Sequence, residues 1–529
     1  MEPSPGTPPL TDMGSMTPRR YPGLVAGELA VFVLAAAARL AVVLTSGGFG
    51  GNYGYDTGVY YAAGDALVHG RVPYRDFVLL HPPGLMLTLA PFGWLGRVTT
   101  DHAGFVAACL AFTALGAVNA VLVVRVARRM GVEPWPALLG GGFYALWYGA
   151  IRAEYLPRLE PLGNFLLLAG LLALLAAADS RRSWPAVAGG AALGAAASVK
   201  IWWAAPMLLV LAWQLTGDRR WRRLALPAAG AAAALVLING PFLLLSGGRM
   251  WQQVVTQQLG RAPNQTSVPT RLAQLSGVNY LSLPRPAELV LLAVIAVVAL
   301  AVCWLAWGTP SARLAVALTL LQVAVLVLAP SWFSFYTDYA APAIAVTLAA
   351  GAGALAARAN GVPAAGGRAA RPGRLDRAPV AVIAPVAVVA LAALETVLLI
   401  VTGRSNVVAP FPREPLARAV ADTRCLMSDS SMALIQLNAL SRGLANGCQN
   451  WVDVTGRTYG PDKPASPGIS RRANARWQAS LRAYLLSGDA VIVVRADGSG
   501  LSSATAAAIR QGGVLAAVDG HVVYRTARR

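Results

Sequence analysis

The sequence predicts an α-helical polytopic membrane protein with a small α/β domain at its C-terminal end. Of the 529 residues, 56% are hydrophobic and only 13% are charged. The apolar residues also lie in runs long enough to cross a bilayer, which a soluble globular protein does not show. From Pro410 onward the chain turns polar, with short β-rich runs between helical patterns. These observations separate a membrane part from a folded domain outside the membrane.

Windows of about 20 apolar residues predict roughly eleven membrane helices. They lie near 24–45, 102–124, 134–151, 158–178, 185–199, 201–216, 224–245, 286–307, 314–330, 339–357 and 380–402. The pair around Lys200 has an alternative, which is one long buried helix with a charge in its middle. Two short spans are preferred because they keep the charge pattern on both sides.

The formal net charge of +20 comes from arginines that cluster in short loops between the apolar runs. This is the positive-inside bias of membrane proteins, and the basic stripes of a nucleic-acid-binding protein are absent. We therefore expect a multi-pass protein of the cell membrane with a cytoplasmic N-terminus. The predicted cytoplasmic basic segments are Arg19 and Arg20; Arg125, Arg128 and Arg129; Arg181 and Arg182; Arg219, Arg220, Arg222 and Arg223; Arg313; and 358–377.

This orientation gives the chain its expected domains. Residues 1–22 form a disordered cytoplasmic tail, with no convincing cleavage site of a signal peptide after them. A membrane domain covers 23–402 and contains a large outer loop at 46–101 and a flexible, basic cytoplasmic connector at 358–379. An extracytoplasmic α/β domain covers 403–529.

The outer loop and the C-terminal domain have local patterns of their own. Gly58 to His69 and Leu85 to Leu95 have helical spacing and are too short to cross the bilayer, so we expect helices that lie on its surface. In the C-terminal domain, we expect Cys425 and Cys448 to pair in an oxidising compartment, which would stabilise the domain by roughly 3 kcal/mol. The alternative is two buried free thiols. The predicted strands are 425–428, 490–495, 514–518 and 521–526, and the predicted helices are 431–441, 469–486 and 502–511.

Four short motifs follow one another along the membrane part, and all of them are predicted to lie on the outer face. They are DTGVYY at 56–61, HPPG at 81–84, RLEPLGNF at 158–165 and SVKIW at 198–202. Their order resembles the polytopic glycosyltransferases of the GT-C superfamily over roughly residues 20–402. It is most similar to actinobacterial mannosyl- and arabinosyltransferases that use polyprenyl-phosphate sugars, and more distantly to protein mannosyltransferases and aminoarabinose transferases.

The resemblance implies that Asp56 is the catalytic base. A sugar hydroxyl is a poor nucleophile, so a carboxylate must take its proton as it attacks the donor. The alternative is that Asp56 only caps the helix that follows it. Thr57 stands where some relatives carry a second carboxylate, which weakens the case for a metal held by adjacent acids. A divalent ion, Mg²⁺ or Mn²⁺, would need Asp56 with Glu154 or Glu160, and the sequence shows no compact cluster of oxygen ligands.

Other polar residues on the outer face are candidates for binding the donor and the acceptor, and each has a plainer alternative. Lys200, Arg152, Arg158 and His81 would bind the donor phosphate, and Glu160, Glu154, Tyr336 and Tyr339 would bind sugar. The lysine could instead snorkel to the headgroups, and the arginines could pair with the glutamates. The tyrosines, with Trp332 and Phe333, could form an aromatic belt. We expect Asp76 and Asp338 in solvated loops.

The sequence thus predicts an enzyme that transfers a sugar, mannose or arabinose, from a polyprenyl phosphate to a cell-envelope glycan or glycolipid. The alternatives are a flippase for a lipid-linked sugar and a non-catalytic scaffold of envelope synthesis. A flippase predicts charges along a transmembrane path and a repeated half-structure, and the sequence shows neither. Walker, HExxH and GxSxG motifs are absent from the sequence, so it gives no sign of a nucleotide-driven pump, a zinc protease or a serine hydrolase.

Overall fold

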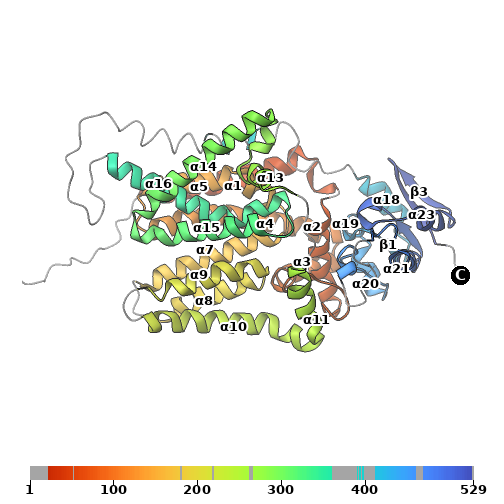
Figure 1. The fold of residues 1–529 in the computed structure, drawn as a ribbon. Coiled ribbons are helices and arrows are strands. Elements are labelled where there is room, and N and C mark those ends of the chain that lie inside the picture. Colours follow the sequence, from red (N-terminus) through yellow and green to blue (C-terminus); the bar gives the residue numbers. More distant parts are fainter. Residues whose placement is uncertain are drawn as a thin grey trace, which may run out of the picture.

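The computed structural model describes residues 22–459 and 469–526, apart from 52, 179–181, 217–219, 261–265 and most of 360–410. The predicted tail 1–22, the connector 358–379 and the last predicted span 380–402 fall largely outside these residues. Two parts are evident in Figure 1: a bundle of long helices, and a smaller unit with a β-sheet at one end of it.

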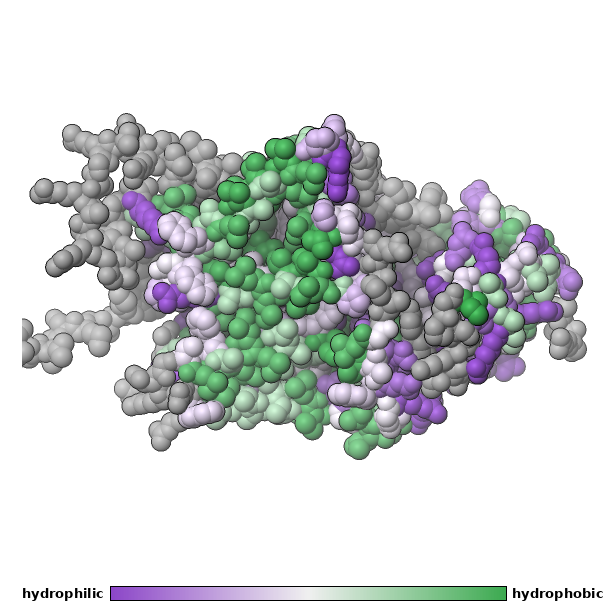
Figure 2. Space-filling view, in the orientation of Figure 1, coloured by the Kyte–Doolittle hydropathy of each residue, from purple (hydrophilic) through white to green (hydrophobic). Residues whose placement is uncertain are grey.

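Seven of the described helices are long and apolar enough to cross a membrane, some of them together with a short 3₁₀ turn at their start. They are α1 (Pro22–Thr45), α4 (Asp101–Arg129), α7 (Leu159–Ala178), α10 (Arg220–Ser246), α14 (Arg285–Trp307), α15 (Arg313–Leu328) and α16 (Ala341–Ala359). Each matches a predicted span. Apolar side chains of α14 point outward, with Val290 and Val297 both 66% exposed. Figure 2 shows hydrophobic residues over the helical bundle and hydrophilic ones over the end unit, as expected for a bilayer-embedded bundle.

Two further predicted spans meet at Lys200, and the structure has two separate helices there. These are α8 (Trp184–Ala197) and α9 (Ala204–Trp213), joined through the 3₁₀ turn η2 (Ile201–Trp203). Lys200 itself has an extended backbone. The two-helix interpretation is therefore correct, and it leaves the lysine in a break between helices.

The predicted continuous span 134–151 is wrong. The chain forms α5 (Pro134–Leu146) and α6 (Tyr148–Glu154), with Trp147 extended between them. The apolar run hides this break because Trp147 is itself buried. As a consequence α6 starts a new direction and carries Arg152 and Glu154 on a short helix of its own.

Two short helices lie between the bundle and the end unit, in the place of the predicted surface helices (Figure 1). They are α2 (Tyr55–Val68) and α3 (Gly84–Val98), and they pack closely on each other. A Cβ on Gly93 would lie 2.7 Å from the Cα of Asp65, so only glycine allows this approach. The shorter elements on this side are η1 (Gly48–Gly50), α11 (Gly248–Trp251), the π-helical turn η3 (Gln252–Thr256), α12 (Gln257–Leu259), α13 (Val268–Ser276), η4 (Val278–Leu281) and η6 (Ser334–Ala340).

The end unit, here called the C-terminal unit (411–459 and 469–526), is built on a four-stranded sheet. Its strands are β1 (Leu426–Ser428), β2 (Ala490–Ile492), β3 (Val514–Val518) and β4 (His521–Arg525), in the order β1-β2-β4-β3. β1 and β2 are parallel and the other pairs antiparallel. All four match predicted strands.

The helices of the C-terminal unit are α18 (Arg413–Ala419), α19 (Ser431–Gln436), α20 (Leu440–Ala445), α21 (Ala475–Leu485), α22 (Ala496–Ser499) and α23 (Ser503–Arg510), with a 3₁₀ turn, η7 (Gly456–Tyr459). The single helix expected at 431–441 is instead two, because Asn438 has a left-handed backbone between α19 and α20. Cys425 and Cys448 form a disulfide, with Cα atoms 5.7 Å apart.

Candidate active site

Asp56 lies in the first turn of α2, on the side of the bundle that faces the C-terminal unit. The N-cap residue of this helix is Gly54, so the alternative that Asp56 serves as the cap is wrong. Gly54 has a φ of 43°, a conformation that favours glycine and starts the helix abruptly. The side chain of Asp56 is half-buried at a helix N-terminus, where a carboxylate is stabilised by the helix dipole.

The HPPG and SVKIW motifs meet in space. The backbone N–H of Gly84 donates to the carbonyl of Ser198 at 2.8 Å. A Cβ on Gly84 would lie 2.5 Å from the same oxygen, so this contact needs a glycine. The turn that carries His81 is thereby fixed next to the break between helices that carries Lys200.

Lys200 forms a buried ion pair with Glu160. The two side chains are 2.8 Å apart and at most 3% exposed. The ammonium group also lies 3.8 Å from the ring centres of both Trp202 and Tyr336. A cation this deep is stabilised by its carboxylate and by the faces of the two rings. The alternative that Lys200 snorkels to the headgroups is therefore wrong.

Tyr336 and Tyr339 come from the 3₁₀ turn η6 and reach the same place. The rings of Tyr336 and Trp202 have centres 4.8 Å apart, and the Tyr339 hydroxyl donates to the carbonyl of Trp202 at 2.9 Å. Tyr339 is fully buried. Tyr336 thus faces the charged pair, whereas Tyr339 supports the ring beside it.

Arg158 is a buried cation of a different kind. It is 6% exposed, and its Nε and Nη1 atoms have no hydrogen-bond partner among the described residues. Its guanidinium plane lies 4.2 Å from the centre of the Phe335 ring. A Cβ on Gly54 would lie 3.8 Å from Nη2, so the guanidinium sits beside the turn that leads into Asp56. A buried guanidinium with free donors is costly unless an anion pairs with it.

Tyr60 is the residue around which these groups gather. It lies one helical turn after Asp56 and its ring is edge-on to that of His81, with centres 5.8 Å apart. Burial, and then the charges of Asp56 and Glu160, raise the pKa of Tyr60 well above its usual value. Its phenol therefore stays protonated and can serve as a hydrogen-bond donor. Tyr336 also raises the pKa of Tyr60, and the charge of Arg158 lowers it.

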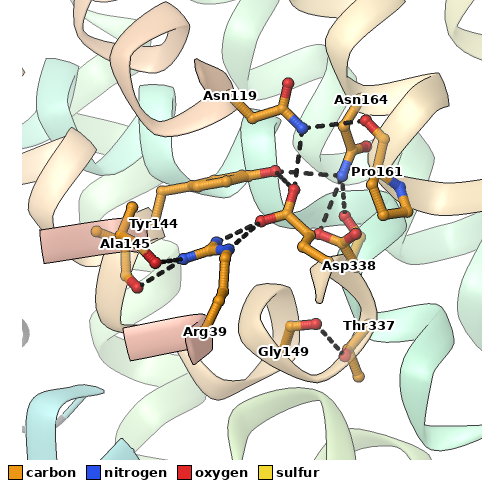
Figure 3. Close-up of polar contacts among 11 residues, drawn as sticks. Arg39, Asn119, Tyr144, Ala145, Gly149, Pro161, Asn164, Thr337 and Asp338 are labelled. Atoms are coloured by element: carbon orange, nitrogen blue, oxygen red, sulfur yellow. Dashed lines mark hydrogen bonds and ion pairs between the residues drawn. The ribbon is translucent and has the colours of Figure 1, made fainter. Parts of the chain in front are cut away.

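Glu154 and Arg152 lie in other surroundings. Glu154 is fully buried and is bound by Arg39, by Asn119 at 2.9 Å and by the Tyr144 hydroxyl at 2.7 Å (Figure 3). With both oxygens engaged, it does not reach a sugar, so the expectation that it binds one is wrong. Arg152 donates through Nη1 to the Tyr280 hydroxyl and lies over that ring, so it has a partner that the sequence did not predict.

The Glu154 network fixes the turn between α6 and α7. Asn164 of α7 donates to the Asp338 carboxylate at 3.0 Å, and Asn119 of α4 also binds the carbonyl of Pro161 (Figure 3). Asp338 is fully buried, so the expected solvated loop at this position is wrong. Because the network clamps both ends of the turn, it holds Arg158 and Glu160 in place.

Sequence reasoning missed two residues of this region. Arg39 lies within the first apolar run, and a charge at that depth alone signals a buried partner. Tyr60 was part of the DTGVYY motif but was given no role of its own, although its spacing of four from Asp56 puts both on one face of a helix. Among the described residues no group of three or more His, Cys, Asp or Glu side chains is placed to hold a metal ion.

Comparison with known proteins shows what this chain is similar to. The model of glycosyltransferase family 87 matches residues 79–331, and no curated protein sequence matches the chain. The oligosaccharyltransferase of Archaeoglobus fulgidus shares the fold in its apo form, with 14% identity, a TM-score of 0.53, and a match over 88% of this chain and 69% of that chain. The same enzyme in complex with Zn and sulfate is 13% identical to this chain, with a TM-score of 0.50. That match covers 88% of this chain and 68% of the other.

A third comparison is with the protein O-mannosyltransferase complex of S. cerevisiae bound to the sugar donor. The identity is 17% and the TM-score 0.36, and the match covers 43% of this chain but only 34% of that chain. This TM-score is too low to establish a common fold. The chain is thus similar to a glycosyltransferase family over residues 79–331, and it shares the fold of a membrane oligosaccharyltransferase. The particular family whose model it matches is glycosyltransferase family 87.

Proposed function

We propose that the protein transfers a sugar from a polyprenyl-phosphate donor to a hydroxyl of a cell-envelope glycan or glycolipid. The sugar is mannose or arabinose, and the reaction takes place on the outer face of the cell membrane. The family 87 match supports glycosyl transfer. The nature of the donor is inferred from the motif resemblance and from the charges around Asp56.

The observation that carries the proposal is the buried guanidinium of Arg158, whose Nε and Nη1 atoms have no hydrogen-bond partner among the described residues. A buried Arg with these donors, next to the Gly54 turn that leads into Asp56, suits an anionic leaving group, since its planar fork matches a phosphate. The neighbouring charges Lys200 and Glu160 pair with each other, so Arg158 supplies the positive charge left over for the ligand. His81 lies close by and would contact the same phosphate.

The reaction then needs one base and one phosphate site. Asp56 takes the proton of the acceptor hydroxyl while the acceptor oxygen forms a bond to the anomeric carbon. The bond between that carbon and the phosphate oxygen breaks, and its electron pair leaves with the polyprenyl phosphate. Arg158 stabilises the charge that builds up on the phosphate. No separate acid is required because the leaving group departs as an anion.

The remaining residues would orient the sugar. Lys200 engages one oxygen of Glu160, which leaves the rest of that carboxylate to accept bonds from sugar hydroxyls. This changes the role expected for Lys200 from phosphate ligand to support of Glu160. Tyr60 would donate a hydrogen bond, and Tyr336 would offer its edge to the sugar ring.

The test is a comparison of donors. Membranes with the wild-type protein are incubated with a cell-envelope glycolipid extract and radiolabelled mannose or arabinose. Each sugar is supplied either on a polyprenyl phosphate or on a nucleotide, after endogenous lipid carriers have been depleted. We expect transfer from one lipid-linked sugar and none from the nucleotide forms. Transfer from a nucleotide sugar alone, or no transfer above membranes that lack the protein, would contradict the proposal.

A further inference from the structure

Tyr55, the residue before Asp56, is bound by residues of the C-terminal unit. Tyr55 begins α2, and its hydroxyl donates to Oδ1 of Asp453 at 2.7 Å while accepting from the backbone N–H of Thr455 at 2.7 Å. The guanidinium of Arg495 lies 3.7 Å from the centre of the Tyr55 ring. Burial, and then the charge of Asp453, raise the pKa of Tyr55, so the phenol keeps its proton. The C-terminal unit therefore contacts both the hydroxyl and the ring face of Tyr55.

The partners of Tyr55 are themselves tied to the sheet of the C-terminal unit. Asp453 also accepts from the backbone N–H of Gly456, which shapes the loop around the phenol. The backbone N–H of Arg495, three residues beyond β2, donates to Asp429 at 3.0 Å, and Asp429 directly follows β1. The position of the Tyr55 hydroxyl is thus tied to strands β1 and β2 and not to a free loop.

The rest of α2 is docked in the same way. Gly58 approaches α19 so closely that a Cβ on it would lie 2.6 Å from the backbone nitrogen of Met432. Near the other end of the helix, the Ser441 hydroxyl lies 3.0 Å from both oxygens of Asp65. The C-terminal unit therefore contacts α2 at its first turn, along its side and near its last turn.

We propose that Tyr55 is a positioning residue, through which the C-terminal unit sets the orientation of the first turn of α2 and so of Asp56. This inference rests on the proposed role of Asp56 as the base. A base acts only within hydrogen-bond reach of the proton it removes, and displacements well under an ångström are costly. The donor phosphate would be held by Arg158, which belongs to the turn before α7 and not to α2. Loss of the contacts of Tyr55 with the C-terminal unit should thus slow sugar transfer without weakening donor binding.

The experiment compares two tyrosines that lie two residues apart. Tyr55→Phe removes the hydrogen-bonded hydroxyl and keeps the ring. Tyr53→Phe is the matched control, because Tyr53 is 1% exposed and its hydroxyl has no hydrogen-bond partner in the described part of the chain. Purified proteins in lipid nanodiscs are assayed with the polyprenyl-phosphate sugar that the wild type uses, and kcat and the donor KM are measured separately. Asp453→Ala and the double variant with Tyr55→Phe complete a double-mutant cycle.

We expect kcat to fall on the order of tenfold in Tyr55→Phe with the donor KM unchanged, and Tyr53→Phe to match the wild type. Asp453→Ala should cause a similar loss, and adding Tyr55→Phe to it should cause little more. If the wild type is active, three results would overturn this inference and leave the proposed function standing. They are an unaffected Tyr55→Phe, a Tyr55→Phe with a changed donor KM, and a loss in Tyr55→Phe that adds fully to the loss in Asp453→Ala. An inactive wild type would instead overturn the proposed function, and the inference with it.

Discussion

The ammonium group of Lys200 lies 2.8 Å from the carboxylate of Glu160 and is almost completely buried. Two aromatic rings flank the lysine, and the break between α8 and α9 exists at this position. The pair thus neutralises two charges that a membrane domain could not hold singly. Arg158, two residues before Glu160, has no hydrogen-bond partner at its Nε and Nη1 atoms in the described part of the chain. This contrast is the basis of the different roles that we propose for the two cations.

We predict that Lys200→Met destabilises the protein by about 3–5 kcal/mol, because it leaves the Glu160 carboxylate buried without its partner. The double variant Lys200→Met/Glu160→Gln removes both charges and should recover most of this loss. Thermal unfolding of the purified variants in one detergent measures the effect. A double variant no more stable than Lys200→Met would show that the two charges are not coupled.

Arg158→Met should behave in the opposite way. The free energy of unfolding should hardly change, since the variant removes unsatisfied buried donors, but the donor KM should rise about tenfold or more. Arg158→Lys, which keeps the charge and loses the fork, should lie in between. Unfolding temperature and donor KM are measured on the same preparations. An unchanged KM, or a loss of stability like that of Lys200→Met, would argue against a phosphate site at Arg158.

Gly58→Ala tests the docking of α2 on the C-terminal unit by a single methyl group. The new Cβ would meet the Met432 backbone at 2.6 Å, so α2 and α19 must move apart. We expect transfer activity to fall and protease cleavage between the two parts to become faster. Gly142→Ala is the control, because a Cβ there meets nothing within 4 Å and alanine favours a helix. Equal behaviour of the two variants would refute a tight α2–α19 contact.

The end of α2 should make stability depend on pH. The Asp65 side chain, which lies 3.4 Å from Nδ1 of His69, raises the pKa of this histidine against the opposing effect of burial. Because the pKa of His69 is raised on folding, its contribution to the free energy of unfolding is complete below its unfolded pKa of about 6.5. The contribution is lost as pH rises through the folded pKa. When the pH is raised from about 6 to about 9, the unfolding temperature of the wild type should therefore fall more than that of His69→Gln. Equal losses in both proteins would contradict this assignment.

Much of the membrane fold could be predicted because it rests on composition. A run of about 20 apolar residues has few options other than a spanning helix, and all seven long described helices were expected. The break at Trp147 was not, because a buried tryptophan continues the apolar run and leaves no signal in hydropathy. The strands of the C-terminal unit were foreseen from their β-branched runs, but the split of 431–441 depends on one left-handed residue, Asn438.

The site was foreseen in part. Asp56 was singled out by the motif resemblance, whereas Lys200 and Glu160 stood out as polar residues next to apolar runs, where they are costly. Their pairing could not be read from the sequence, since it depends on how helices far apart in the chain pack. Glu154 was therefore assigned to a sugar, although Arg39 binds it. The contact of Tyr55 with Asp453 joins residues 398 apart and left no trace in local patterns.

The central claim is that Asp56 is the base for transfer from a lipid-linked sugar. The most direct measurement compares wild type and Asp56→Asn in nanodiscs with the polyprenyl-phosphate sugar that the wild type uses. Asp76→Asn serves as the control, since Asp76 is an exposed carboxylate of the same outer loop that pairs with Arg75. We expect kcat of Asp56→Asn to fall about 10²–10⁴-fold while the donor KM stays near that of the wild type. Transfer by Asp56→Asn at the wild-type rate, or an equal loss in Asp76→Asn, would contradict it.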